Sequence, residues 1–133
     1  MDKSVANPCT IQPGEAICQI KELAERKSLR FALRTPKGLR GAFLIRYEGQ
    51  FYGYLNRCLH VPMELDYDTN DFFTGDGCHL LCQTHGALYE PETGHCTGGP
   101  PIGLSLFPVK IAVRGTAVYL EQRPEDFPPD ALD

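Results

Sequence analysis

Short apolar runs, several of them alternating with polar residues, are spread along the whole chain. Phe31 and Leu33 alternate with polar neighbours within residues 30–34, which predicts a half-buried strand. Apolar runs at residues 42–47 and 50–55 flank Glu48-Gly49, a pattern typical of a β-hairpin. By the same criteria, further strands are predicted at residues 16–20, 72–74, 78–82, 106–113 and 116–120. Two more hairpins are predicted among them, at Gly75-Asp76-Gly77 and at Arg114-Gly115.

The segments between these strands predict connections. Residues 21–28 contain helix-forming residues, but about two turns are too few for a helix to be stable alone. Residues 85–103 are rich in Gly and Pro and are predicted as a loop. The Pro-rich segment from Arg123 onward is predicted to be loosely attached. Many short strands without an internal repeat predict an all-β fold, a small antiparallel β-sandwich or barrel that carries its function in long loops.

Length and composition indicate a single small domain. The 133 residues, of which 42% are hydrophobic, are too few for a large multidomain enzyme. The first residues lack the apolar segment of a signal peptide, and no apolar run approaches the roughly 18–20 residues of a membrane span. We therefore expect a cytoplasmic protein with no membrane association. In such a reducing setting, its six cysteines are more often ligands than disulfide partners.

The net charge of −4 is unevenly distributed along the chain and argues against nucleic-acid binding. Residues 21–46 contain eight Lys or Arg and two Glu, and we interpret this basic region as a solvated surface. Between Cys58 and Val109 there is no Lys or Arg. This second region contains seven acids, Glu64, Asp66, Asp68, Asp71, Asp76, Glu90 and Glu92.

Two cysteine–histidine pairs carry the strongest chemical signal. Cys58 and His60 form a first hook, C-x-H, and Cys82 and His85 form a second hook, C-x-x-H, 21 residues further on. One tetrahedral Zn²⁺ accepts two thiolates and two imidazoles, although zinc sites more often use paired C-x2–4-C ligands. A dinuclear iron–sulfur cluster accepts the same set when two histidines bind one of its irons. The hooks therefore predict a metal centre and favour the cluster over zinc.

Residues 16–120 resemble a Rieske ferredoxin domain. The hooks carry this resemblance together with residues 85–94, which follow the family's H-G-x-x-F/Y-x-x-x-T-G run, and with Gly98-Gly99-Pro100. The family usually has Pro after each ligand cysteine, where this chain has Leu59 and Gln83, a difference that concerns loop packing rather than ligation.

The resemblance implies a fold, a cofactor and a set of residues around it. The fold is a Rieske-type antiparallel β-sandwich with a small cluster-binding subdomain of loops and short strands. It covers residues 15–122, between an N-terminal extension (1–14) and a Pro-rich acidic C-terminal tail (123–133). The cofactor is one 2Fe–2S cluster, with Cys58 and Cys82 on one iron and His60 and His85 on the other. Tyr89, Gly86 and Pro100 are expected beside it.

Several positions favour a low reduction potential for this cluster. Respiratory Rieske proteins have a loop disulfide, whose positions here are Met63 and Thr84, and a serine hydroxyl where this chain has Ala87. Tyr89 keeps one hydroxyl donor, while the acids described above disfavour an added electron. We therefore expect an oxygenase-type centre near the bottom of the roughly −150 to +300 mV Rieske range.

The remaining cysteines and histidines are expected to have no role at the cluster. Cys78 and His79 lie in a predicted strand, and His95 and Cys96 are not required by the motif. We expect no Cys78–Cys96 disulfide, and Cys9 and Cys18 are expected to be free thiols.

Three functions are compatible with these residues. The favoured one is a ferredoxin that passes single electrons from a flavin reductase to a non-haem iron oxygenase. The others are a small Rieske-like subunit of a nitrite reductase, a family that often lacks the ligands present here, and a Zn-binding module without redox activity. Catalysis by this chain is not expected, because it has no nucleotide loop, nucleophile arrangement or 2-His-1-carboxylate iron site.

Overall fold

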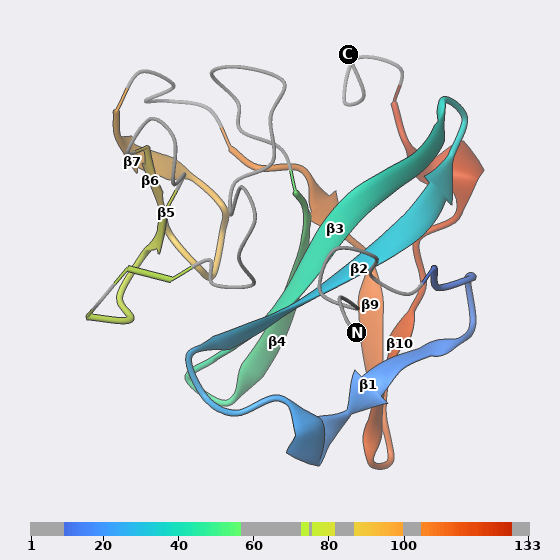
Figure 1. The fold of residues 1–133 in the computed structure, drawn as a ribbon, viewed down its shortest axis with the longest axis horizontal. Coiled ribbons are helices and arrows are strands. Elements are labelled where there is room, and N and C mark those ends of the chain that lie inside the picture. The colour runs from blue at the N-terminus through green and yellow to red at the C-terminus, as the bar shows by residue number, and fades with distance from the viewer. Residues whose placement is uncertain (1–9, 57–72, 75, 82–86, 100–104, 129–133) are drawn as a thin grey trace, which may run out of the picture.

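A computed structural model describes residues 10–56, 73–74, 76–81, 87–99 and 105–128 of the chain. Apart from two short 3-10 turns, η2 (Ile20–Glu22) and η3 (Pro124–Asp126), its regular elements are β-strands (Figure 1). The strands are β1 (Ala16–Gln19), β2 (Lys27–Thr35), β3 (Gly38–Tyr47), β4 (Gln50–Leu55), β5 (Leu80–Leu81), β6 (Leu88–Tyr89), β7 (Cys96–Gly98), β8 (Pro108–Val109), β9 (Ile111–Arg114) and β10 (Ala117–Leu120). The predicted all-β class is confirmed. The described part of the chain has no helix long and apolar enough to cross a membrane.

The strands form three antiparallel sheets. The largest has the order β2-β3-β4-β8, and a second has the order β1-β10-β9. The third, β5-β6-β7, stands apart at the upper left of Figure 1. This arrangement matches the expected sandwich with a small subdomain of short strands.

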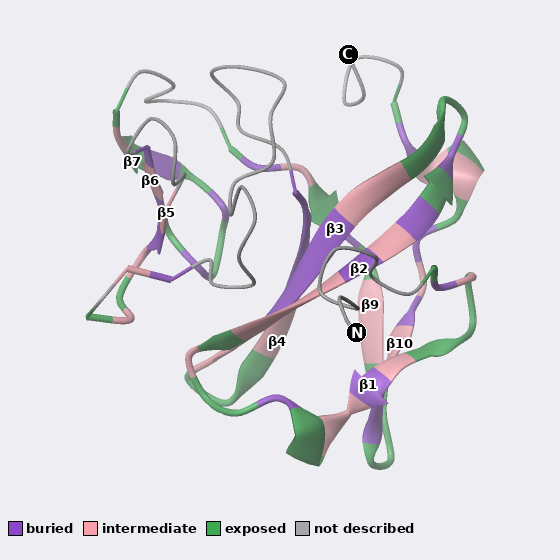
Figure 2. Cartoon of the chain, viewed as in Figure 1, coloured by how far each residue is buried: buried purple, intermediate pink, exposed green. Residues whose placement is uncertain are grey.

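Strand β3 contributes side chains to two hydrophobic cores, one on each of its faces. Ala42 and Leu44 contribute to the core between the two larger sheets, which also contains Phe31, Leu33 and Val118. The opposite face of the same strand contributes to a second core, which reaches β5 and β6 and consists of Phe43, Ile45, Tyr54, Phe73, Leu80, Ala87, Tyr89, Cys96 and Leu106. Residues 42–45 are consequently buried without interruption (Figure 2).

The hairpin turns show which local predictions hold. Glu48 and Gly49 have φ of +51° and +79°, and Tyr47 pairs with Gln50, which confirms the predicted two-strand hairpin of β3 and β4. The hairpin predicted at Arg114-Gly115 is also present, but its turn lies one residue later, at Gly115-Thr116, since Arg114 pairs with Ala117. A third hairpin joins β2 to β3 through residues 36–37 and was missed, because an X-Pro-Lys-Gly sequence does not interrupt a clear alternation.

Two predicted boundaries are wrong. Residues 85–103 are not all loop, because β6 and β7 lie within them; strands of two or three residues are too short to show an alternation. The predicted strand at 106–113 is divided, since β8 pairs with β4 and β9 pairs with β10. The helix-forming residues 21–28 give only the 3-10 turn η2 before β2 begins at Lys27.

The C-terminal segment is attached to the core as far as Phe127. This side chain is 6% exposed and belongs to the core between the two larger sheets. Its ring centroid lies 5.3 Å from that of Phe107. The expectation of a loosely attached segment from Arg123 onward is therefore wrong for residues 123–127, because a single aromatic residue among prolines gives no periodic signal.

Replacing Phe127 with alanine is expected to lower the free energy of unfolding by about 3 kcal/mol, because it empties a buried aromatic site. Urea unfolding followed by circular dichroism measures this loss. Val113→Ala is the matched control, since Val113 is 51% exposed and its truncation is expected to cost less than about 0.5 kcal/mol. Equal losses for the two variants would contradict the attachment of this segment.

Candidate functional site

The residues that frame the predicted metal centre are described, while its ligands are not. Cys58, His60, Cys82 and His85 lie outside the described residues. The same holds for Gly86 and Pro100, and for Cys9. Tyr89 is described in β6, where its side chain is completely buried. The described ends of the segments that carry the hooks therefore define the framework of the site.

Those ends converge on the β5-β6-β7 sheet. Leu81 pairs with Leu88, so the chain enters and leaves the second hook on neighbouring strands. Phe73, the first described residue after the first hook, forms a bridge with Leu80 in β5. His95 bridges Ser105, where the chain resumes after residues 100–104. The small sheet and its flanking bridges thus hold both ends of the second hook segment and of residues 100–104, and the C-terminal end of the first hook segment, whose other end follows β4.

Gly99 allows two of these segments to approach closely. It has φ of +92°, and a Cβ built on it would lie 2.8 Å from the Cα and 3.2 Å from the Cβ of Ala87. A contact of 2.8 Å to backbone leaves no room for a side chain. Gly99 therefore allows the Gly98-Gly99 segment to lie against Ala87, the first described residue after the second hook.

The turn before β5 is organised by Asp76. Its carboxylate accepts hydrogen bonds from the Thr74 hydroxyl and from the Cys78 N–H, the latter at 3.0 Å. These two donors, the Thr74 hydroxyl first, hold the pKa of Asp76 below its usual value. Together with the bond from the Thr74 N–H to the His79 carbonyl (2.9 Å), they confirm the described part of the predicted hairpin around residues 75–77.

Arg26 fastens this turn to the large sheets across a long stretch of sequence. Its Nη1 donates to the Gly77 carbonyl at 2.7 Å. Its guanidinium carbon lies 4.7 Å from the centroid of the Tyr47 ring, and that ring stacks on Phe73 with centroids 6.2 Å apart. This clamp was missed, because nothing in the local sequence connects residue 26 with residue 77.

Tyr54 fastens the other side of the subdomain. This buried residue of β4 donates its hydroxyl to the Pro91 carbonyl at 2.8 Å, and burial raises the pKa of its phenol well above the ordinary value. A Cβ on Gly94 would lie 2.8 Å from Tyr54 Cε1, so the turn after β6 packs closely against the tyrosine ring. Of these residues, Pro91 and Gly94 lie in the family run recognised in the sequence (residues 85–94), whereas Tyr54 does not.

The other thiols and imidazoles have structural roles. Cys18 is a buried free thiol, as expected, and burial is the main cause that raises its pKa. Cys78 and Cys96 are unpaired, as expected, and Cys96 Sγ donates to the Gly98 carbonyl at 3.1 Å. His95 is exposed, with its Nδ1 3.3 Å from Ser105 Oγ. Within the described residues, no cluster of three or more His, Cys, Asp or Glu is arranged to hold a metal ion.

The residues fit the expected cluster in chemistry and in framework. Two thiolates and two imidazoles are the donor set of a Rieske centre, and they come from the two hooks alone. The framework brings three of the four ends of the hook segments to the β5-β6-β7 sheet, and Gly99 allows the backbone approach that closely packed loops need.

Comparisons with known proteins agree with this framework. The family model of the Rieske [2Fe-2S] domain matches residues 15–108. A search among curated proteins gives no match. A solved structure, the ferredoxin of carbazole 1,9a-dioxygenase from Nocardioides aromaticivorans IC177, is 18% identical with a TM-score of 0.63; the comparison covers 84% of this chain and 99% of the ferredoxin.

Two further solved structures show how widely the fold is used. The Sphingomonas yanoikuyae B1 ferredoxin is 17% identical with a TM-score of 0.59, covering 82% of this chain and 98% of that one. The terminal oxygenase of carbazole 1,9a-dioxygenase from Novosphingobium sp. KA1 is 20% identical with a TM-score of 0.62, covering 79% of this chain and 28% of that one. At these identities the likeness shows a shared fold. Because the family match spans more than half of the sequence, the chain belongs to the Rieske domain family, whose prosthetic group is one Rieske-type 2Fe–2S cluster.

Proposed function

We propose that this protein is a single-electron carrier, the ferredoxin component that supplies a terminal non-haem iron oxygenase. The observation that carries this proposal is the fold match to ferredoxins of dioxygenase systems, which covers almost the whole of those chains, 99% in one case. The same fold accounts for only 28% of an oxygenase chain. A flavin reductase as electron donor and a cytoplasmic setting, both expected from the sequence, belong to the same proposal.

The four ligands are part of this proposal. Cys58 and Cys82 would bind one iron through their thiolates, and His60 and His85 would bind the other through their imidazoles. When bound, the cluster supplies reversible one-electron chemistry. The chain's own contribution is to hold the two hooks at a fixed spacing, with Arg26 and Tyr54 fastening opposite sides of the subdomain to the large sheets.

A low reduction potential follows from the groups that surround the hooks. Ala87 is buried and offers no hydroxyl donor. Asp76, Glu90 and Glu92 are exposed on the turns of the subdomain, where their negative charge opposes an added electron. We therefore propose a potential in the lower part of the Rieske range.

The Tyr89 hydroxyl is the donor best placed to raise the reduction potential of the cluster. Tyr89 is completely buried in β6 and pairs with Leu80, two positions before Cys82 of the second hook. Replacing Tyr89 with phenylalanine is expected to lower the midpoint potential by about 40–60 mV, the equivalent of losing one hydrogen bond worth about 1–1.5 kcal/mol. Tyr52→Phe is the control, because Tyr52 lies in β4 and is partly exposed. An EPR-monitored titration in which both variants keep the wild-type potential would contradict this role.

The acids around the subdomain are proposed to steer a basic partner. The rate at which the reduced protein passes its electron to a Rieske-type terminal oxygenase is expected to fall about tenfold between about 0.02 M and about 0.3 M salt. Stopped-flow absorbance measures this rate. Glu92→Gln is expected to lower it at low salt, and Glu15→Gln, next to β1, is the control. A rate that does not change with salt would remove the steering, and no electron transfer at all would overturn the proposed function.

A further inference from the structure

A cavity of about 530 Å³ lies between η2, β3 and the β9–β10 turn. Its lining residues are Gln19, Ile20, Lys21, Arg46, Gly115 and Thr116. The volume falls within the roughly 300–1,000 Å³ that small-molecule sites occupy. In Figure 1, β1 and the β9–β10 turn lie at the bottom of the molecule, far from β5–β7 at the upper left. The cavity is therefore separate from the cluster-binding subdomain.

The two cations of this cavity have no carboxylate partner among the described residues. Arg46 Nη1 donates to the carbonyls of Ile20 (3.4 Å) and Leu23 (3.1 Å), and its guanidinium faces the Phe51 ring at 5.3 Å. Its buried Nε has no acceptor. Lys21 is exposed and forms no ion pair within the described part of the chain. The remaining N–H donors of the Arg46 guanidinium therefore lie beside a second positive charge, that of Lys21.

Three acids lie close to these cations in the sequence, Glu22, Glu25 and Glu48. Glu22 Oε1 accepts the backbone N–H of Gln19 at 2.7 Å, and Glu48 is ion-paired with Arg26. The carboxylate of Glu25 accepts the N–H groups of Glu48 and Gly49, which are the first causes that lower its pKa, and the charges of Arg26 and Arg46 lower it further. Within the described residues none of these carboxylates forms an ion pair with Arg46 or Lys21, so Glu25 offsets the positive charge of the cavity only in part.

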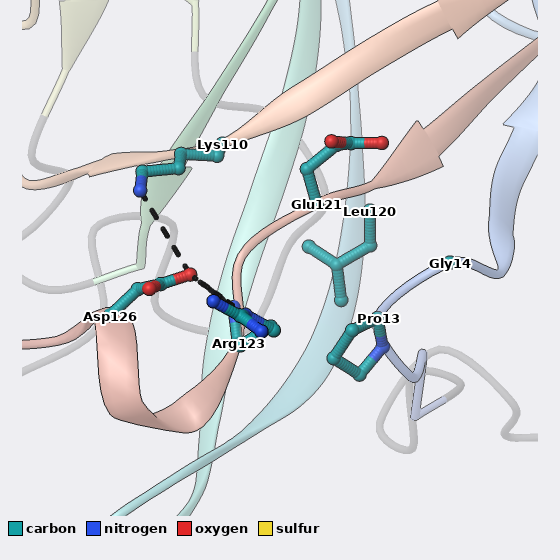
Figure 3. A pocket seen from close by; sticks show the side chains of 7 residues that line it. All are labelled: Pro13, Gly14, Lys110, Leu120, Glu121, Arg123 and Asp126. Atoms are coloured by element: carbon teal, nitrogen blue, oxygen red, sulfur yellow. Dashed lines mark hydrogen bonds and ion pairs between the residues drawn. The ribbon is translucent and has the colours of Figure 1, made fainter.

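A second cavity provides the contrast. It measures about 390 Å³ and is lined by Pro13, Gly14, Lys110, Leu120, Glu121, Arg123 and Asp126. Figure 3 shows Lys110 and Arg123 both directed at Asp126, with N–O distances of 3.9 Å and 3.7 Å. The cations of this second cavity are neutralised internally, which distinguishes it from the first.

We propose that the cavity between η2 and the β9–β10 turn binds a small oxyanion, a carboxylate or a phosphate group, on Arg46 and Lys21. A guanidinium presents parallel N–H donors that match two oxygens of such a group. Lys21 adds a mobile charge at the rim, and Gln19 and Thr116, whose side chains are hydrogen-bonded to each other at 3.1 Å, add a polar wall. The site goes beyond electron transfer and does not depend on the cluster.

Calorimetric titration of the cluster-loaded full chain tests this site, with inorganic phosphate in one arm and citrate in the other, at constant ionic strength set with chloride. At least one anion is expected to bind saturably at one site per chain. Arg46→Gln is expected to weaken that binding about tenfold or more, and Lys21→Gln about threefold. Binding of phosphate alone assigns a phosphate ligand, and binding of citrate alone assigns a carboxylate.

Lys110→Gln is the matched control, because it removes one lysine from the neutralised second cavity. It is expected to leave the affinity unchanged within about twofold. Should Arg46→Gln fail to fold, Lys21→Gln decides, since Lys21 is exposed and η2 does not depend on its side chain. The proposal is overturned if neither anion binds saturably to the wild type, or if Lys21→Gln and Lys110→Gln bind with the same affinity.

Discussion

Replacing Cys82 with serine is expected to leave the purified protein without its 2Fe–2S cluster. A serine hydroxyl is a poor substitute for a thiolate, and the second hook then offers only one ligand, His85. The readouts are the iron and sulfide content per chain and the EPR signal of the reduced protein. Both are expected to fall to about a tenth of the wild-type value or less, a loss of at least about 1.4 kcal/mol in cluster affinity.

Cys78→Ser is the control for this loss. Cys78 lies four positions earlier, is exposed and is not a predicted ligand. It is expected to keep wild-type iron content, because the backbone N–H of Cys78 still donates to Asp76 at 3.0 Å and a serine hydroxyl can replace the Sγ that donates to the Asp76 carbonyl at 3.6 Å. The ligand assignment would be wrong if Cys82→Ser retained the cluster while Cys78→Ser lost it.

Gly99→Ala is expected to have the second-largest effect, on stability and cluster content together. A positive φ of +92° strains any L-residue, and the new Cβ would meet the Ala87 backbone at 2.8 Å. We expect a loss of about 2–4 kcal/mol in the free energy of unfolding, the sum of the backbone penalty and the cost of overpacking. Because Ala87 lies two residues after His85 of the second hook, iron content is expected to fall as well.

Gly14→Ala separates the two causes. Gly14 has a similar φ of +89°, and no atom lies within 4 Å of the Cβ built on it. Its substitution is expected to cost only the backbone penalty of about 1–2 kcal/mol and to leave iron content unchanged. Chemical denaturation and iron analysis of the two variants in parallel give the comparison. Equal effects would mean that the Gly99–Ala87 approach does not support the site.

The local sequence predicts those turns and strands of this fold that depend on the residues of one short segment. Glu48-Gly49 forms a hairpin because both residues accept a positive φ, and the run Ala42–Ile45 is apolar because both faces of β3 are buried. In contrast, β6 and β7 are strands only because each pairs with a neighbour in the β5-β6-β7 sheet, and their few residues show no periodicity. Phe127 was missed for a related reason, since its burial depends on a ring 20 positions away, Phe107.

The residues of the candidate site likewise fall into two groups, those that the local sequence predicts and those that only the folded chain brings together. The four ligands are predicted from spacing and residue type, because a metal centre needs donors of fixed chemistry at the ends of short hooks. The residues that hold the subdomain in place are not predictable in this way. Arg26 reaches Gly77 over 51 positions, and Tyr54 reaches Pro91 over 37, so only the folded chain brings them together.

An EPR-monitored redox titration of the wild-type protein, with iron counted in the same sample, tests the central proposal most directly. We expect two irons per chain, a one-electron transition and a midpoint in the lower part of the Rieske range, below about +100 mV. A colourless protein that contains one zinc ion would contradict the redox function. A midpoint above about +100 mV would contradict the low-potential, oxygenase-type centre proposed here.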